Sequence, residues 1–262
     1  MIPIDQYAYV NRLAMVHPLE KMAFSVVFLL FAITTKDVLI SLITFFVMSV
    51  FILIAAKIPL KTYIKLLLLP GFFLLSSLVS ILLSFTTTSE LPSHVAQWHI
   101  GNVTIFIGTA SIDTAYHLFF SVLASVSCLY FLTLTTPITA ITYAMRKLKI
   151  PTVFVDLCDL TYRFIFVFLT SMQRIYQAQQ SRLGYQHKKQ WLQSAGFLVT
   201  SMFKDVFKRA HELNNAMQSR CYDESISEPF YHYKTSRRNW YAIAGCCCLL
   251  LIVYFTLGGL LT

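Results

Sequence analysis

Residues 38–56 read VLISLITFFVMSVFILIAA, a run that contains no charged side chain. A helix of about 20 apolar residues crosses the hydrocarbon core of a bilayer, and this run has that length. Further apolar runs occupy residues 22–35, 63–85, 114–134 and 240–260. We therefore predict an all-α membrane protein with about five transmembrane helices.

The overall composition agrees with a membrane protein. Hydrophobic residues make up 56% of the 262 residues, charged residues make up 13%, and the mean hydropathy is +0.63. These values lie outside those of soluble globular enzymes. Lys and Arg outnumber Asp and Glu by 21 to 12, which in a membrane protein is a signal of topology and not of nucleic-acid binding. We expect the lipid bilayer, and no nucleic acid, as a partner.

The basic residues predict which connections are cytoplasmic. Lys57, Lys61 and Lys65 lie around the connection between the second and third runs, whereas residues 86–111 contain no Lys or Arg. Because positive charge marks cytoplasmic loops, we place the first connection inside and the second outside. The N-terminus is then cytoplasmic and the C-terminus external, in a multi-pass protein of the cell (inner) membrane.

This topology divides the chain into three parts. Residues 1–134 are predicted to form an N-terminal bundle of four spans, and residues 240–262 to form a C-terminal transmembrane helix. Residues 135–239 hold 15 of the 21 basic residues. We predict that they form a cytoplasmic or interfacial bundle of amphipathic helices.

Local signals place the helices of this middle part. Thr136-Pro137 starts an amphipathic helix that Pro151 ends. Residues 152–170 are more apolar, and we predict a separate, partly embedded helix there. Two long amphipathic helices are predicted next, at residues 171–190 and 197–221.

Two groups of polar residues belong to the predicted bundle. One lies at the cytoplasmic mouth of the first span, and we interpret it as interfacial anchors and an N-terminal helix cap: Asp5, His17, Glu20 and Lys21. The other forms a small-residue face on the third span, suited to contact with a helix of a substrate-binding subunit: Ser76, Ser77, Ser80 and Ser84. The Pro70-Gly71 pair of that span is tolerated where neighbouring helices satisfy the freed carbonyl.

A short sequence motif occurs twice in the middle part. Residues 178–182 read AQQSR and residues 216–220 read AMQSR. Arg182 and Arg220 each continue an apolar stripe at the C-terminal end of a predicted helix. A guanidinium there suits the acidic groove of a partner that offers two equivalent grooves. The alternative is that both arginines cap their helices or meet lipid phosphate.

Several stretches together resemble a known family: residues 4–9, 11–13, 17–21, 134–151, 162–163, 181–185 and 216–223. They are similar to the transmembrane T component of energy-coupling factor (ECF) transporters, most closely the cobalt and nickel CbiQ-type branch. The resemblance implies a non-catalytic scaffold that joins two cytoplasmic ABC-type ATPase subunits to a substrate-binding integral membrane subunit. ATP hydrolysis in the partners then drives uptake of cobalt or nickel ions.

The most specific marks of this resemblance are the two Ala-Arg-Gly motifs of the family. They read here Ser181-Arg182-Leu183 and Ser219-Arg220-Cys221. The resemblance implies that these six residues couple to the ATPase, with each arginine in a groove of one ATPase subunit. The flanking Ala and Gly are replaced in both motifs. We expect Gly184, one position later, to supply backbone freedom at the first.

An enzyme is the alternative from another class. The sequence has no G-x-x-x-x-G-K-[ST] phosphate loop, so if the process uses ATP, a partner must bind it. His211-Glu212 lacks the second histidine of a zinc peptidase helix. Asp156 and Asp159 form a weak magnesium-diphosphate motif, and an ion pair between Asp159 and Arg163 explains them better. We expect no catalytic residue and no cofactor. A vitamin-type substrate for the same scaffold is the nearer alternative, and a metal- or lipid-dependent intramembrane enzyme the more distant one.

No metal site is predicted either. Residue types that bind nickel or cobalt occur in and near the outer loop, but at irregular separations: Glu90, His94, His99, Asp113 and His117. The consecutive Cys246, Cys247 and Cys248 point about 100° apart on a helix and cannot converge on one ion. We interpret these three cysteines as small apolar packing residues.

Overall fold

The structure is a computed structural model, and it describes residues 3–35, 37–82, 84–86, 94–100, 103–222, 233 and 235–261. The chain forms two compact units. The first, here called the bundle unit, comprises residues 2–137 and 232–262. The second, here called the hairpin unit, comprises residues 138–231.

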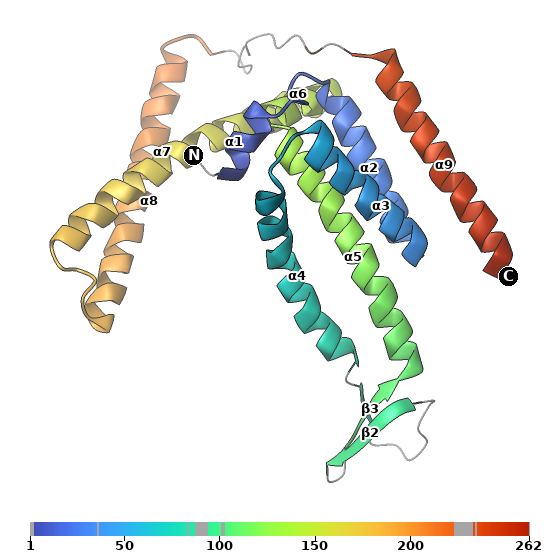
Figure 1. Ribbon diagram of the computed structural model, residues 1–262. Coiled ribbons are helices and arrows are strands. Elements are labelled where there is room, and N and C mark those ends of the chain that lie inside the picture. Colours follow the sequence, from blue (N-terminus) through green and yellow to red (C-terminus); the bar gives the residue numbers. More distant parts are fainter. Residues whose placement is uncertain are drawn as a thin grey trace. The chain divides into compact units, whose positions relative to one another are not determined.

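The bundle unit is built around one long helix, α5. Its helices are α1 (Pro3–Val10), α2 (Pro18–Thr34), α3 (Val38–Val50), α4 (Leu60–Leu82), α5 (Thr109–Thr135) and α9 (Arg237–Leu261), and a π-helical turn, Phe51–Ala55, continues α3. Helix α5 contacts α1, α2, α3 and α4, and Figure 1 shows it running the length of the bundle beside them.

The predicted spans occur as helices. Three described segments are long and apolar enough to cross a membrane: Val38–Ala55, Leu60–Leu82 and Ser111–Thr135. This confirms the prediction of an all-α membrane protein. Helices α2, with 17 residues, and α9, with 25, occupy the other two predicted positions. Their crossing of the bilayer stays a prediction.

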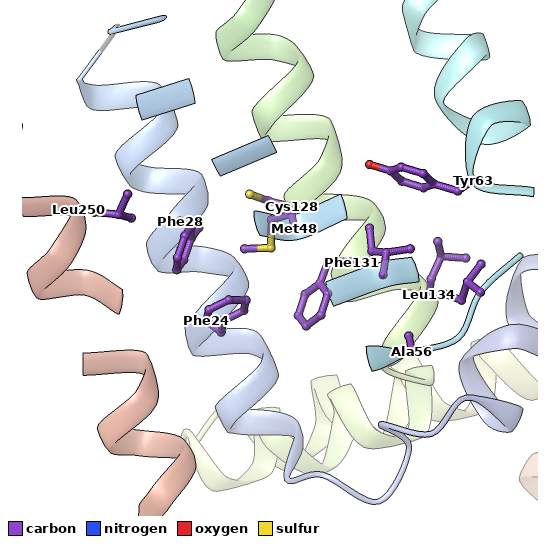
Figure 2. Packing of buried hydrophobic residues seen from close by; sticks show 11 residues of the cluster. Phe24, Phe28, Met48, Ala56, Tyr63, Cys128, Phe131, Leu134 and Leu250 are labelled. Atoms are coloured by element: carbon purple, nitrogen blue, oxygen red, sulfur yellow. The ribbon is translucent and has the colours of Figure 1, made fainter. Parts of the chain in front are cut away.

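The core of the bundle unit is aromatic. Figure 2 shows Phe24 and Phe28 of α2 close to Met48 of α3 and to Phe131 of α5. The ring centroids of Phe24 and Phe28 are 4.6 Å apart, and those of Phe24 and Phe131 are 5.6 Å apart. Cys246 packs against the same cluster, which confirms the predicted packing role for that cysteine. These contacts join helices that are distant in sequence through dispersion and burial.

The polar residues at the start of α2 cap this helix and bind it to the end of α5. The Nδ1 atom of His17 accepts a hydrogen bond from the Leu19 amide at 3.2 Å, which confirms the predicted N-terminal cap. The buried Lys21 ammonium donates to the Thr135 carbonyl at 2.8 Å. Since both groups are enclosed, this bond ties the beginning of α2 to the end of α5.

Buried Glu20 fixes the start of α9. Its carboxylate accepts the Ser236 amide at 2.9 Å and the Asn239 side-chain amide at 2.8 Å. Hydrogen bonds to an ionised group are about twice as strong as neutral ones. No local sequence pattern predicts these bonds, because the partners of Glu20 lie more than 200 residues away.

Helix α4 contains Pro70 in its interior, and α5 compensates for it. Proline has no backbone N–H, so the carbonyl four residues earlier, that of Leu66, loses its partner within the helix. The Tyr130 hydroxyl of α5 donates a hydrogen bond to this carbonyl at 2.8 Å. The prediction that a neighbouring helix satisfies the freed carbonyl is confirmed.

Substitution of Tyr130 with Phe is expected to lower the free energy of unfolding by about 1–2 kcal/mol, because the Leu66 carbonyl is then unpaired in an apolar environment. Thermal unfolding in detergent measures the change. Tyr116→Phe is a matched control on the same helix, since the Tyr116 side chain is 55% exposed. Equal unfolding temperatures for the two variants would contradict the assigned role of Tyr130.

A small antiparallel sheet connects α4 to α5. Its strands are β1 (Ser84–Thr86), β2 (His94–Ile100) and β3 (Val103–Gly108), in the order β1-β3-β2. We predicted a loop outside the membrane at residues 86–111, and this connection contains the sheet. The predicted position of Ser84 on the third helix is wrong, because Ser84 pairs with Phe106 across β1 and β3. β1 has only three residues, and β2 and β3 do not alternate strictly between polar and apolar residues, so pairing decides their conformation.

The hairpin unit consists of α6 (Ile138–Lys147), α7 (Thr152–Ser181) and α8 (Lys188–Gln218). Helix α6 lies between Pro137 and Pro151, as predicted. Helix α7 is continuous, so the predicted break near residue 170 is wrong. No Gly or Pro occurs between residues 152 and 183, and without a breaker an established helix continues. Helix α8 likewise begins before the predicted residue 197.

The two aspartates of α7 bind α6. Asp156 forms an ion pair with Arg146 at 2.6 Å, and Asp159 accepts a hydrogen bond from the Thr142 hydroxyl at 3.1 Å. The predicted pair between Asp159 and Arg163 is wrong: α7 turns the aspartates toward α6, whereas the Arg163 side chain is exposed. A structural role for both aspartates, in place of metal-diphosphate binding, agrees with this arrangement.

Candidate functional site: two matching helix ends

The first arginine ends α7 in a defined turn. Arg182 is the C-cap residue of α7. The Leu183 amide donates to the Gln180 carbonyl at 3.0 Å, and the Gly184 amide donates to the Gln179 carbonyl at 3.0 Å. This pair of bonds is the Schellman motif, which satisfies the last carbonyls of a helix.

The second arginine lies in the same turn at the end of α8. The Cys221 amide donates to the Gln218 carbonyl at 3.1 Å, and the Tyr222 amide donates to the Met217 carbonyl at 3.1 Å. These bonds match those around Arg182 position for position. The sequence motif that occurs twice therefore forms the same turn twice.

The serines of the two motifs also make equivalent hydrogen bonds. The Ser181 hydroxyl donates to the Gln177 carbonyl at 3.0 Å, and the Ser219 hydroxyl donates to the Asn215 carbonyl at 2.8 Å. Both serines are exposed, as are Arg182 and Arg220. Each motif thus presents its arginine at the surface, on a helix end whose backbone groups are satisfied.

The third residue of each motif adopts a left-handed conformation. The φ angle is 60° at Leu183 and 50° at Cys221. This region costs a residue with a Cβ atom roughly 1–2 kcal/mol, and glycine enters it freely. The position therefore favours glycine, although neither motif has one.

Gly184 does not use the backbone freedom that we expected it to supply. Its φ angle lies outside the left-handed region, and its role is close packing. A Cβ atom there would lie 2.6 Å from the Ser194 hydroxyl oxygen and 3.1 Å from the Gln179 carbonyl oxygen. The Ser194 hydroxyl donates to the Gly184 carbonyl at 2.8 Å. The glycine is needed because Ser194, near the start of α8, packs against the turn that follows α7.

A polar contact between the helices holds the two motifs in one unit. Asp205 of α8 accepts hydrogen bonds from the Ser171 hydroxyl of α7 at 2.7 Å and from the Arg209 Nε atom at 3.0 Å. These bonds, the one from Ser171 first, hold the pKa of the Asp205 carboxyl below its ordinary value. Asp205 is not among the residues that we predicted from the sequence. Its signal is that it is the one acidic residue between residues 160 and 211.

The remaining predicted site residues are not gathered into a second site. On α4, Ser76 and Ser80 are exposed and Ser77 is half-buried. His94 and His99 belong to β2, and Glu90 lies outside the described residues. Within the part of the chain that the structure describes, no group of three or more His, Cys, Asp or Glu residues could hold a metal ion.

The sequence profile of the CbiQ family, described as "Cobalt transport protein", matches residues 10–231. The match covers both helix ends and most of the bundle. The chain belongs to the CbiQ family. It is a membrane protein of a family of cobalt transport proteins.

Three relatives match most of this chain. An uncharacterized protein of Methanocaldococcus jannaschii, MJ1089, is 33% identical over 85% of this chain and 81% of its own length. A putative fused cobalt transport protein CbiMQ of Methanocorpusculum labreanum is 32% identical over 86% of this chain and 37% of its own. The cobalt transport protein CbiQ of Salmonella typhimurium is 25% identical over 85% of this chain and 97% of its own.

The left-handed turn gives a physical reason for a glycine at the third position of each motif. Leu183→Gly is expected to raise the free energy of unfolding by about 1 kcal/mol, because it removes the strain at a φ angle of 60° and the lost side chain is 60% exposed. The change is measured as the thermal unfolding midpoint in detergent.

A leucine near the start of α8 is the matched control. The Leu192 side chain is 69% exposed, and Leu192→Gly is expected to lower the free energy of unfolding by about 1 kcal/mol, since glycine weakens a helix interior. Opposite signs for the two substitutions support the strain at Leu183. A decrease in both variants would refute it.

Proposed function

We propose that this chain is the transmembrane scaffold, or T component, of an ECF-type ABC transporter for cobalt or nickel ions. Two cytoplasmic ABC-type ATPase subunits hydrolyse ATP, and a separate integral membrane subunit binds the substrate. The chain itself is not a catalyst and transmits movement between these partners. Its N-terminus is cytoplasmic and its C-terminus external, in the cell (inner) membrane.

The observation that carries this proposal is the pair of matching helix ends. Arg182 and Arg220 occupy the same position in two Schellman turns and are both exposed. A dimeric ATPase has two equivalent grooves, and two equivalent arginines on one rigid hairpin fit such a partner. If Arg182 and Arg220 only capped their own helices, the same Schellman turn would not have to occur at both helix ends.

Membership of the CbiQ family supports the cobalt or nickel substrate. The fused relative, whose printed name is CbiMQ, supports a second membrane protein as partner, because a fusion keeps two proteins together. We assign Ser76, Ser77 and Ser80 of α4 to the contact with that subunit, as small residues that allow helices to approach closely. Ser84, in β1, lies beyond the helical part of this face.

The test is recovery of the complex. The tagged full chain is extracted from its native membrane in mild detergent, and its partners are identified by mass spectrometry and assayed for ATPase activity. We expect an ABC-type ATPase and a polytopic membrane protein to be recovered with it, and cobalt or nickel uptake by vesicles that contain the complex. A chain that purifies alone, even after gentle crosslinking, would overturn the proposal.

A further inference from the structure

The polypeptide joins the bundle unit to the hairpin unit at two places. It leaves the bundle unit after Pro137, just beyond the end of α5, and it returns at residue 232, before the start of α9. Any force that the chain itself carries from the hairpin unit therefore enters the bundle unit at the C-terminal end of α5 or at the N-terminal end of α9. Two consecutive residues of α2, Glu20 and Lys21, bind these two helix ends.

Lys21 holds the outgoing connection. Its ammonium donates to the Thr135 carbonyl at 2.8 Å and to the Leu13 carbonyl at 3.2 Å. The last carbonyls of a helix have no partner within it and form its negative end, so a cation there satisfies and stabilises them. The Asn11 side-chain amide adds a bond to the Leu134 carbonyl at 3.1 Å. Because Lys21 and Thr135 are both buried, water does not compete for their bond.

Glu20 holds the returning connection. Its carboxylate binds the backbone amide of Ser236, the residue that precedes α9, and the side-chain amide of Asn239 in the first turn of that helix. The N-terminal end of a helix is its positive end, which favours a carboxylate. The His17 ring also lies edge-on to the ring of Tyr233, with centroids 6.2 Å apart. The acid and the base of α2 therefore each meet a helix end of opposite polarity.

From this pair the contacts continue into the aromatic core. Glu20, Phe24 and Phe28 are spaced four residues apart and share one face of α2. The Phe24 ring centroid is 5.1 Å from that of Phe51, in the π-helical turn, and 5.6 Å from that of Phe131 of α5 (Figure 2). A close-packed core does not deform continuously. A displacement of the start of α2 is therefore passed on to the helices around it.

We propose that Glu20 and Lys21 are positioning residues that bring both chain connections to one helix, so that a movement of the hairpin unit displaces α2 within the bundle unit. The inference rests on the proposed function, in which the ATPase subunits move the hairpin unit. Loss of either residue frees one connection from α2, and the movement is then absorbed in that connection. ATP hydrolysis continues, but less of it drives uptake.

The first test is Lys21→Met, which keeps a long unbranched side chain and removes the ammonium. The full chain is reconstituted in vesicles with the partners recovered with it, and uptake of cobalt and of nickel ions, each supplied alone, is measured per ATP hydrolysed. We expect ATPase recovery and ATP hydrolysis within about twofold of the unsubstituted complex, because both arginine motifs are unchanged. Uptake per ATP is expected to fall about tenfold, as one buried bond to a charged group is lost.

Ser25→Ala is the matched control. The Ser25 hydroxyl donates to the Cys128 carbonyl at 2.8 Å, so this variant also removes a buried bond from α2 to α5, but at neither connection. We expect a lower thermal unfolding midpoint for both variants, and a change in uptake per ATP of less than about twofold for Ser25→Ala. A fall of equal size in the two variants would mean that uptake follows stability, and would overturn the inference.

The second test acts on the returning connection and leaves α2 unchanged. Asn239→Ala removes one of the two bonds to Glu20 from a half-buried position of α9. We expect uptake per ATP to fall about threefold, a smaller effect because the Ser236 bond remains. This variant decides the question if Lys21→Met is too unstable to purify, and unchanged uptake per ATP would then refute the inference.

The remaining outcomes separate the inference from the proposed function. If the unsubstituted chain recovers no ATPase, the proposed function fails and the inference with it. If the unsubstituted complex takes up ions, and Lys21→Met and Asn239→Ala take up as many per ATP, only the inference fails. If Lys21→Met no longer recovers the ATPase, Lys21 supports the docking of the ATPase and not the transmission of movement, and the inference is likewise overturned.

Discussion

Replacing both Arg182 and Arg220 with alanine is expected to abolish cobalt or nickel uptake and to leave the chain in the membrane without its ATPase subunits. Removal of a charged, hydrogen-bonded contact residue from an interface costs about 2–5 kcal/mol, which weakens docking by roughly 30-fold to several thousand-fold for each arginine. Both side chains are exposed and neither supports the helix backbone, whose bonds come from the turn itself. The fold should therefore survive.

Two further variants sharpen this prediction. Arg174→Ala removes another exposed arginine of α7, outside both motifs, and is expected to keep uptake and ATPase recovery near those of the unsubstituted chain. Replacement of Arg182 and Arg220 with lysine keeps the charge but loses the planar fork, and we expect only partial recovery of the ATPase. Normal uptake by the double alanine variant would remove the basis of the proposed coupling site.

The ion pair between Arg146 and Asp156 is expected to be the most sensitive point for stability. Their side chains are 2.6 Å apart, and that of Asp156 is only 5% exposed. Asp156→Ala leaves the arginine without this carboxylate, and removal of one partner of a buried pair costs about 3–5 kcal/mol. Since the pair joins α6 to the first turns of α7, we expect a large fall in the thermal unfolding midpoint and a weaker coupling to the ATPase.

A double substitution shows whether the loss of stability comes from the unpaired charge or from the lost packing. Arg146→Met combined with Asp156→Leu removes both charges and fills the same space, and it is expected to regain most of the lost stability. The exposed pair of Lys208 and Glu212, 3.8 Å apart, provides the control, because Glu212→Ala should change stability by less than about 1 kcal/mol. If Asp156→Ala is no more harmful than Glu212→Ala, the pair does not hold α6 to α7.

The helices of the bundle could be predicted because each apolar run carries its own signal. Residues 38–55 are predominantly apolar and contain no charged residue, and in a bilayer such a run satisfies its backbone groups as a helix whatever its neighbours are. The limits of α7 were harder to predict, since amphipathic patterns before and after residue 170 differ although the helix continues. The sheet between α4 and α5 could not be predicted, because its short strands depend on one another.

The candidate site was found from the sequence, and its conformation was not. The repeated phrases around Arg182 and Arg220 and their resemblance to a family motif singled out both positions before any geometry was known. The left-handed φ angles of Leu183 and Cys221 run against the preference of those residue types. Only the complete turn, with its two backbone bonds, imposes them.

The sequence by itself determined the class of protein, the places of the apolar helices and the two arginines, since hydropathy and a repeated phrase are properties of neighbouring residues. The tertiary structure decided which groups meet: Asp156 with Arg146, Tyr130 with the Leu66 carbonyl, and Glu20 with the start of α9. Each of these contacts joins different helices. Its energy depends on how the helices pack and not on any local pattern, and for this reason the sequence does not show it.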